Sequence, residues 1–282
     1  VMKRIILNAD DFGRHPCINE AVVKGLTKGC LRSASLMAVG PAFDEAIQIC
    51  KQHPELGTGL HLTLIDGRPV LPASEIPSLV TGTGCFYADH NTFLKHFLRG
   101  HIRLDEVRRE LTAQLQKMQS AGIQPDHIDS HQHMHVLPGI IDIALGLAKA
   151  ASIPALRIPT APLKTPNGLL SDGIGAFIGR AGLHSLAALA RWKADRAGLY
   201  APEHFTGIVA GDAVDQAYLV SILKHLPEGT TEVMLHPGTN NLLLQAECNW
   251  DHDFIKELEA ITAPEIRTLM TRNHIECTNF QQ

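Results

Sequence analysis

The sequence has few of the features that mark disulfide-bonded, nucleic-acid-binding or membrane-spanning proteins. Its six cysteines form no C-x-x-C pair and have no zinc-finger spacing, which predicts reduced thiols. Lys and Arg number 25 against 29 Asp and Glu, and a net charge of −4 excludes a basic surface for nucleic acid. No apolar run approaches the roughly 18 residues of a membrane span, and the one in the opening VMKRIILNADDFG is too short for a signal peptide. We therefore expect a cytoplasmic protein with no stable membrane insertion and no nucleic-acid partner.

Short apolar runs alternate with helix-like segments along the 282 residues. This alternation predicts a parallel sheet with helices outside it, either as a barrel or as an open sheet. A dinucleotide-binding fold is disfavoured because no G-x-G-x-x-G follows the first apolar run. We expect one domain over 1–282, with irregular excursions near 66–103 and 160–175. The strands are expected at 5–7, 35–39, 57–62, 127–135, 155–159, 230–235 and 275–280, and the helices at 17–29, 42–53, 104–120, 138–150, 176–197 and 253–271.

Polar residues follow several of the expected strands, and histidine is unusually frequent, with 16 in the chain. In α/β folds the carboxyl ends of the strands gather at one rim, where active sites form. Two adjacent carboxylates, several imidazoles and one guanidinium at one rim are typical of a metal-assisted hydrolytic site, and a third carboxylate stands close to the imidazoles. The residues concerned are Asp10, Asp11, His61, Asp129, His131, His133, His135, Arg157 and His236.

Each of these residues also has a purely structural interpretation. The two aspartates after the first strand can cap a helix, and a lone histidine such as His61 is often a hydrogen-bonded core residue. His131, His133 and His135 would share one face if the strand continued through them, and burying three imidazoles there favours metal binding or catalysis. Asp129 can orient a ligand histidine or act as a cap. Arg157 can pair with a structural carboxylate, and His236 can be a turn residue.

Five motifs in fixed order resemble one family. NADDFG follows the first expected strand, GLHL lies in the third, and DSHQHMH, LRIP and LHPG come after it in this order. In this combination the sequence resembles the YdjC-like carbohydrate deacetylases, from residue 4 to the C-terminus. The resemblance implies a distorted TIM-like (β/α) barrel of the glycoside hydrolase/deacetylase type that holds one divalent metal ion.

The resemblance also implies roles for individual residues. Asp11, His61 and His131 would bind the metal, with His133 as the competitor of His131. Asp10 would be the general base and His236 the acid for the leaving amine, while Arg157 would hold the substrate or orient Asp10. A divalent ion in such a site lowers the pKa of water from about 15.7 towards 7 and polarises a carbonyl. Two imidazoles favour Zn²⁺, and the carboxylate with open positions also permits Mg²⁺.

The activity implied is removal of the acetyl group from an N-acetylated amino sugar. The sequence leaves open whether this sugar is a chitooligosaccharide or is linked to a hopanoid or another lipid. A metal-dependent phosphoesterase and a non-catalytic sugar- or metal-binding protein are the alternatives. Sugar sites often stack a ring on an aromatic side chain, for which Phe86, Tyr87 and Trp250 are candidates, although packing explains each of them as well. A homodimer is a default expectation only.

Overall fold

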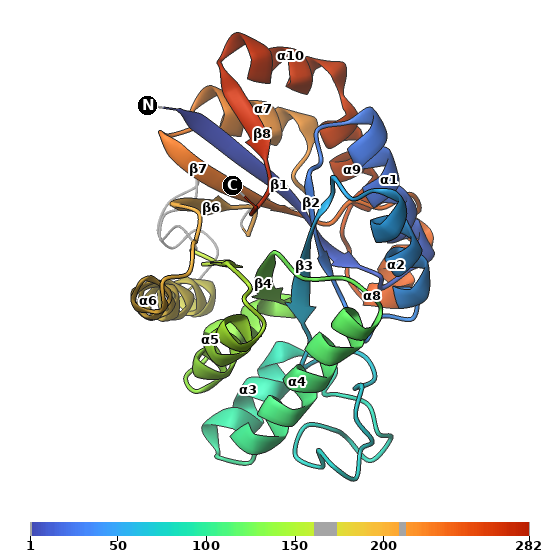
Figure 1. Cartoon of the computed structure of the whole chain (residues 1–282), viewed down its shortest axis with the longest axis vertical. Coiled ribbons are helices and arrows are strands. Elements are labelled where there is room, and N and C mark those ends of the chain that lie inside the picture. The colour runs from blue at the N-terminus through green and yellow to red at the C-terminus, as the bar shows by residue number, and fades with distance from the viewer. Residues whose placement is uncertain (1, 161–173, 209–212, 282) are drawn as a thin grey trace.

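The computed structural model describes residues 2–160, 174–208 and 213–281, and it has a parallel β-sheet at its centre (Figure 1). The strands are ordered β5-β4-β3-β2-β1-β7-β6, and β8 also pairs with β1. All of these pairings are parallel. The strands are β1 (Lys3–Phe12), β2 (Ser33–Leu36), β3 (Gly57–Leu62), β4 (His127–Ser130), β5 (Ala155–Leu156), β6 (His204–Thr206), β7 (Gly229–Leu235) and β8 (Ile275–Thr278).

Strand β1 has ten residues and three partners. One edge pairs with β7 from Lys3 to Ala9. The other edge pairs first with β8, up to Ile6, and then with β2 from Asn8 onward. The central apolar run of β1 is fully buried because it is covered on both faces, as expected for a parallel sheet. This strand carries the NADDFG motif to the rim of the sheet.

The two outer strands, β5 and β6, are brought together by the chain between them. Tyr200 forms a parallel bridge with Ala155 in β5. Four residues later the chain enters β6, which pairs with β7. The sheet therefore curls into a distorted barrel, as predicted from the sequence. It departs from a regular eight-unit barrel because β5 has only two residues and β8 pairs alongside β2 on one edge of β1.

Helices surround the sheet (Figure 1). Local signals explain where several begin: His15 caps α1, which has Pro at its first position, and Asp89, Asp215, Asn240 and Asp253 accept from backbone N–H groups at the starts of α3, α7, α8 and α9. Their bounds are α1 (Pro16–Lys28), α2 (Phe43–Gln52), α3 (His90–Leu98), α4 (Leu104–Ser120), α5 (Ile140–Ala150), α6 (Ile174–Ala197), α7 (Gln216–Lys224), α8 (Asn241–Cys248), α9 (Phe254–Thr262) and α10 (Pro264–Arg272), with a 3₁₀ helix η1 (His131–Val136).

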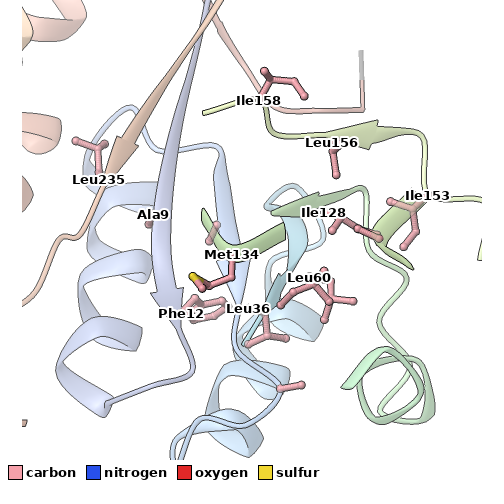
Figure 2. Close-up of a cluster of buried hydrophobic side chains, with 14 of the residues drawn as sticks. Ala9, Phe12, Leu36, Leu60, Ile128, Met134, Ile153, Leu156, Ile158 and Leu235 are labelled. Carbon is pink, nitrogen blue, oxygen red and sulfur yellow. The ribbon is translucent and has the colours of Figure 1, made fainter. Parts of the chain in front are cut away.

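Apolar side chains from successive strands pack together in one hydrophobic core (Figure 2). Phe12 of β1, Leu36 of β2, Leu60 of β3 and Ile128 of β4 are all completely buried. Met134 of η1 joins the same cluster. Burying each of these large side chains contributes about 1.5–3 kcal/mol relative to leaving it in water. This packing fixes the strand ends that carry the polar residues.

The secondary structure expected from the sequence needs correction in several places. The helix expected over 253–271 is two helices, because Pro264 lacks a backbone N–H and begins α10. The 66–103 excursion contains α3, and β6, α7 and α8 were not predicted. Residues 161–173 of the second excursion lie outside the described residues.

All six cysteines are free thiols, as expected. Within the described ranges, no helix combines the length and apolar character needed to cross a bilayer.

Candidate functional site

The carboxyl ends of β1, β3 and β4 bring three polar side chains together at one rim of the sheet. Asp11 of β1, His61 of β3 and His131, directly after β4, offer one ligand atom each within 4.8 Å of one another. Asp11 has a positive φ of 60°, a conformation that Asp tolerates better than most residues. It ends the regular alternation of β1 and begins a turn in which Arg14 N–H donates to the Asp11 carbonyl at 3.0 Å.

Gly13 makes that turn possible. Its φ is 86°, where a side chain is strained, and a Cβ there would lie 2.9 Å from Leu36 Cδ1. The Gly13 N–H donates to Asn19 Oδ1 at 2.8 Å, which ties the turn to α1. The glycine of the DFG motif is therefore required by backbone geometry at the point where Asp11 is presented.

The distances within this trio fit a shared metal ion. Asp11 Oδ1 lies 3.2 Å from His61 Nε2 and 2.9 Å from His131 Nδ1. Ligand atoms bound to one ion at about 2.0–2.2 Å lie about 3–3.5 Å from each other. Asp, His and His donors at these separations are the chemistry that a divalent ion requires.

Asp129 holds His61 in the orientation needed for metal binding. Asp129 Oδ1 is 2.8 Å from His61 Nδ1, and a carboxylate can only accept, so Nδ1 carries the proton and Nε2 is directed toward Asp11. Ser35 Oγ donates to the other Asp129 oxygen at 2.7 Å. A carboxylate behind a ligand imidazole is the usual arrangement in metal sites. Of the two interpretations of Asp129 given above, the structure matches the orienting one.

Opposite charges dominate the electrostatics of the trio. Burial works against the charge of Asp11, but the His131 and His61 imidazoles outweigh it and hold the pKa of Asp11 well below its usual range. Burial alone would lower the pKa of His61, but Asp129 and Asp11 raise it to about 10. Both shifts show that the site strongly favours positive charge beside these carboxylates, as a metal cation would supply.

Asp10 lies beside the trio in a network of buried charges. Arg157 donates from Nη1 and Nη2 to the two Asp10 oxygens, both at 2.6 Å. The same guanidinium contacts Asp129 at 2.8 Å and Glu232 at 2.6 Å. Asn8 Nδ2 donates to Asp10 Oδ1 at 2.8 Å. Arg157 is completely buried, so its contacts are with protein carboxylates.

A second group of possible ligands, Asp10, His61 and Asp129, lies in the same place. The oxygens of both carboxylates already accept hydrogen bonds, from Arg157, Asn8, Ser35 and His61. The Asp11 group is the better metal site because Asp11 Oδ1 contacts the imidazoles of His61 and His131, which are both possible ligands.

The expectation that His131, His133 and His135 share one strand face is wrong. Strand β4 ends at Ser130, and the positive φ values of Gln132 and His133, 50° and 58°, turn the chain sharply. His131 therefore reaches the metal trio, whereas His133 packs edge-to-face with Phe205 and belongs to no candidate metal group among the described residues. Burial lowers the pKa of His133 well below its usual range.

His135 is a structural histidine that predicts a pH effect on stability. Its Nε2 donates to the Arg157 carbonyl at 3.0 Å, and its Nδ1 accepts from Ser130 Oγ at 2.6 Å. Burial lowers its pKa to about 4, so the unfolded chain binds more protons than the folded protein between about pH 6.5 and 4. As the pH is lowered from about 6.5 to 4, this group should decrease the free energy of unfolding by about 3 kcal/mol.

In His135→Gln this part of the pH dependence should disappear, because the amide does not titrate. Urea unfolding of variant and parent at pH 7 and 4.5 measures it. The matched change is His184→Gln at an exposed position of α6, which should behave as the parent does. Equal pH slopes for parent and His135→Gln would contradict the assignment.

His236 follows β7 on the same rim and is partly exposed. Its ring packs edge-to-face with Trp250 and with His252, at centroid distances of 5.0 and 5.7 Å. Burial lowers the pKa of His236, although the negative charges of Asp10, Asp11 and Glu257 act in the opposite direction. Glu257 of α9 accepts a hydrogen bond from the His236 backbone N–H and one from Val214 N–H at 2.8 Å, which anchors this end of β7.

Several residues of the site escaped the sequence analysis. Asp66, from the 66–103 excursion, returns to the rim and accepts from Arg14 at 2.6 Å. Glu232 stands in the middle of β7 beneath Arg157, and burial raises its pKa to about 6. A charged residue within the apolar run of β7 was a usable signal for Glu232. No comparable local signal marks Ser35 or Asp66, whose partners Asp129 and Arg14 are distant in sequence. Asn8 lies in the NADDFG motif, but its contact with Asp10 was not predicted.

Known proteins are similar to this chain over nearly its whole length. A family model described as YdjC-like protein matches residues 4–272. A protein named carbohydrate deacetylase from Geobacillus stearothermophilus is 28% identical over 278 residues, covering 98% of this chain and 96% of that protein. A carbohydrate deacetylase from Homo sapiens is 30% identical over 294 residues, covering 97% of this chain and 88% of that protein.

One solved structure supports the same relationship. It is a crystal structure of an Enterococcus faecalis V583 protein provisionally assigned to cellobiose-phosphate cleavage. It aligns with a TM-score of 0.77 and 26% identity, and the alignment covers 100% of this chain and 98% of that one. Because the family model spans nearly the whole sequence, including the motifs that form this rim, the chain belongs to the YdjC-like protein family.

Proposed function

We propose that this protein is a metal-dependent hydrolase that removes the acetyl group from an N-acetylated amino sugar. The observation that carries the proposal is the convergence of Asp11, His61 and His131 beside Asp10, which Arg157 holds by both oxygens. Full-length relatives named carbohydrate deacetylase support the reaction and the substrate class.

Asp11, His61 and His131 would hold the metal, either Zn²⁺ or Mg²⁺. When bound, a divalent ion acts as a Lewis acid toward an amide carbonyl and makes water a stronger nucleophile at neutral pH. Asp129 contributes by fixing the ring of His61, with its Nε2 toward the ion. Arg14 lies 3.6 Å from the second Asp11 oxygen and helps to orient that carboxylate.

Asp10 is suited to act as the general base. A carboxylate has about four acceptor positions. Arg157 and Asn8 occupy two on Oδ1, and Arg157 occupies one on Oδ2. The remaining position on Oδ2 can take a proton from the attacking water. Of the two roles implied for Arg157, we assign it the orienting one, because its side chain is completely buried.

His236 would return a proton to the departing nitrogen. Amines are poor leaving groups unless protonated, and an imidazole is the side chain best able to donate at near-neutral pH. The position of His236 directly after β7, at the same rim of the sheet as Asp10 and Asp11, suits this role. Glu257 fixes its backbone from below.

The test is acetate release from N-acetylglucosamine oligomers and glycolipid glycosides by metal-loaded protein. We expect release that depends on Zn²⁺ or Mg²⁺ and stops when a chelator removes the metal. Phosphodiesters assayed in parallel should not be cleaved. Lack of acetate across the panel, with one bound metal per chain verified by elemental analysis, would reject the proposal.

Asp129→Ala should weaken metal binding without removing a ligand. Loss of the 2.8 Å contact frees the His61 ring and its tautomer, an effect of about 10- to 100-fold in metal affinity at comparable sites. Competition with a chromogenic chelator measures this affinity. The matched change, Asp142→Ala on the exposed face of α5, should leave it unchanged. Unaltered affinity in Asp129→Ala would contradict the orienting role.

A further inference from the structure

Trp250 presents an aromatic surface next to His236, and the role proposed so far for this rim does not use it. The residue follows α8, and Asn249, with a positive φ of 46°, turns the chain back toward the rim. The rings of Trp250 and His236 are 5.0 Å apart between centroids. Trp250 is 42% exposed, an unusual amount for a large apolar side chain beside a buried polar site.

The orientation of the indole is fixed from one side. His252, itself buried, stacks on one face at 3.9 Å between centroids and 21° between planes. Phe254 packs edge-to-face at 5.7 Å. The backbone N–H of Trp250 donates to the backbone carbonyl of Gln245, and the side-chain amide of Gln245 donates to the His252 carbonyl. Both bonds hold the loop against α8. Because His252 covers one face, the exposed area belongs to the opposite face and the edges, and little conformational entropy remains to be lost on binding.

We infer that the exposed face of Trp250 is the platform on which the pyranose ring of the substrate stacks. This inference rests on the proposed function. The nitrogen that His236 would protonate is bonded directly to a ring carbon of the amino sugar, so that ring must lie beside His236. Trp250 is the neighbouring exposed apolar surface there, and the C–H face of a pyranose matches an aromatic face.

The other two aromatic candidates are explained by packing. Phe86 is 3% exposed and belongs to the hydrophobic core. Tyr87 stacks on His96 of α3 at 4.6 Å, and its hydroxyl donates to the Ser78 carbonyl at 3.4 Å. Both side chains pack against other residues of the 66–103 segment or the core.

The first test separates sugar binding from chemistry. Trp250→Ala should raise KM for N,N′-diacetylchitobiose about tenfold, with a smaller change in kcat, and Trp250→Phe should restore most of the loss. Hydrolysis of 4-nitrophenyl acetate, which contains no sugar, should stay within twofold of the parent. Trp192→Ala, an exposed tryptophan of α6, is the matched control and should leave KM unchanged. An unchanged KM in Trp250→Ala would overturn the inference.

The second test does not need turnover. The chain has two tryptophans, so Trp192→Phe leaves Trp250 as the sole indole. In the metal-loaded Trp192→Phe/Asp10→Asn protein, N,N′-diacetylchitobiose should change the Trp250 fluorescence saturably. Calorimetric binding without a fluorescence change would overturn the platform while leaving the proposed function intact. Absence of binding, together with absence of acetate release by the parent, would overturn both.

Discussion

The Asp10→Asn variant is expected to bind metal and sugar but to lose about 10³-fold in kcat, within the 10²–10⁴-fold range of general-base catalysis. The amide oxygen of Asn can still accept from Asn8 and from one Arg157 N–H, but the amide NH2 cannot accept from the other Arg157 N–H, and the amide cannot take up a proton at neutral pH. Arg157 would keep its contacts with Asp129 and Glu232, so the change should not unfold the site. Acetate release, metal content and sugar binding are the three measurements.

The same chemical change at Asp142→Asn, an exposed position of α5, is the control and should leave kcat as in the parent. Normal sugar binding with lost turnover identifies a catalytic group. Equal turnover of parent and Asp10→Asn would mean that Asp10 is not the base. Lost metal would show instead that Asp10 supports the ion.

The Arg157→Met variant is expected to lose about 3–5 kcal/mol in the free energy of unfolding at pH 7. The guanidinium is completely buried and neutralises three carboxylates that are 3% exposed or less. Methionine fills a similar volume but leaves Asp10, Asp129 and Glu232 as buried charges without their main partner. This loss corresponds to a decrease in Tm of about 10 °C for a chain of this size.

The pH dependence of Arg157→Met has a definite sign. Without the guanidinium, burial raises the pKa of these carboxyl groups in the folded state, as it already does for Glu232. The folded variant then binds more protons than the unfolded chain, so its stability should decrease as pH rises from 5 to 7.5. Urea unfolding at both pH values tests this.

Arg103→Met, at a side chain 66% exposed and paired with Asp105 on the surface, is the matched control. It should change the free energy of unfolding by less than about 1 kcal/mol. If Arg157→Met unfolds as the parent does, the buried network contributes little to stability.

The gathering of aspartates and imidazoles at one rim could be anticipated because parallel strands end at one edge of the sheet. The choice of Asp11, His61 and His131 among them came from the resemblance to the YdjC-like family. The pairing of Arg157 with Asp10 could be stated only as one of two options. The two residues are 147 positions apart. Whether Arg157 contacts Asp10 or a substrate depends on where its side chain is directed after β5 ends at Leu156.

The errors have local backbone causes. The alternating histidines were assigned to one face on the assumption that the strand continues, whereas positive φ values at Gln132 and His133 end it after Ser130. A single helix was expected across Pro264, although proline lacks a backbone N–H and begins a new helix there. In both places the local backbone conformation ended the secondary-structure element earlier than the residue pattern predicted.

By itself, the sequence determined the alternation of strands and helices and the chemical groups available at the strand ends, since both follow from local patterns. The tertiary structure alone decided that His131 rather than His133 faces Asp11, that Arg157 is enclosed by three carboxylates, and that Trp250 lies beside His236. These are contacts through space between distant segments, and their energies depend on packing and burial, which no local pattern specifies.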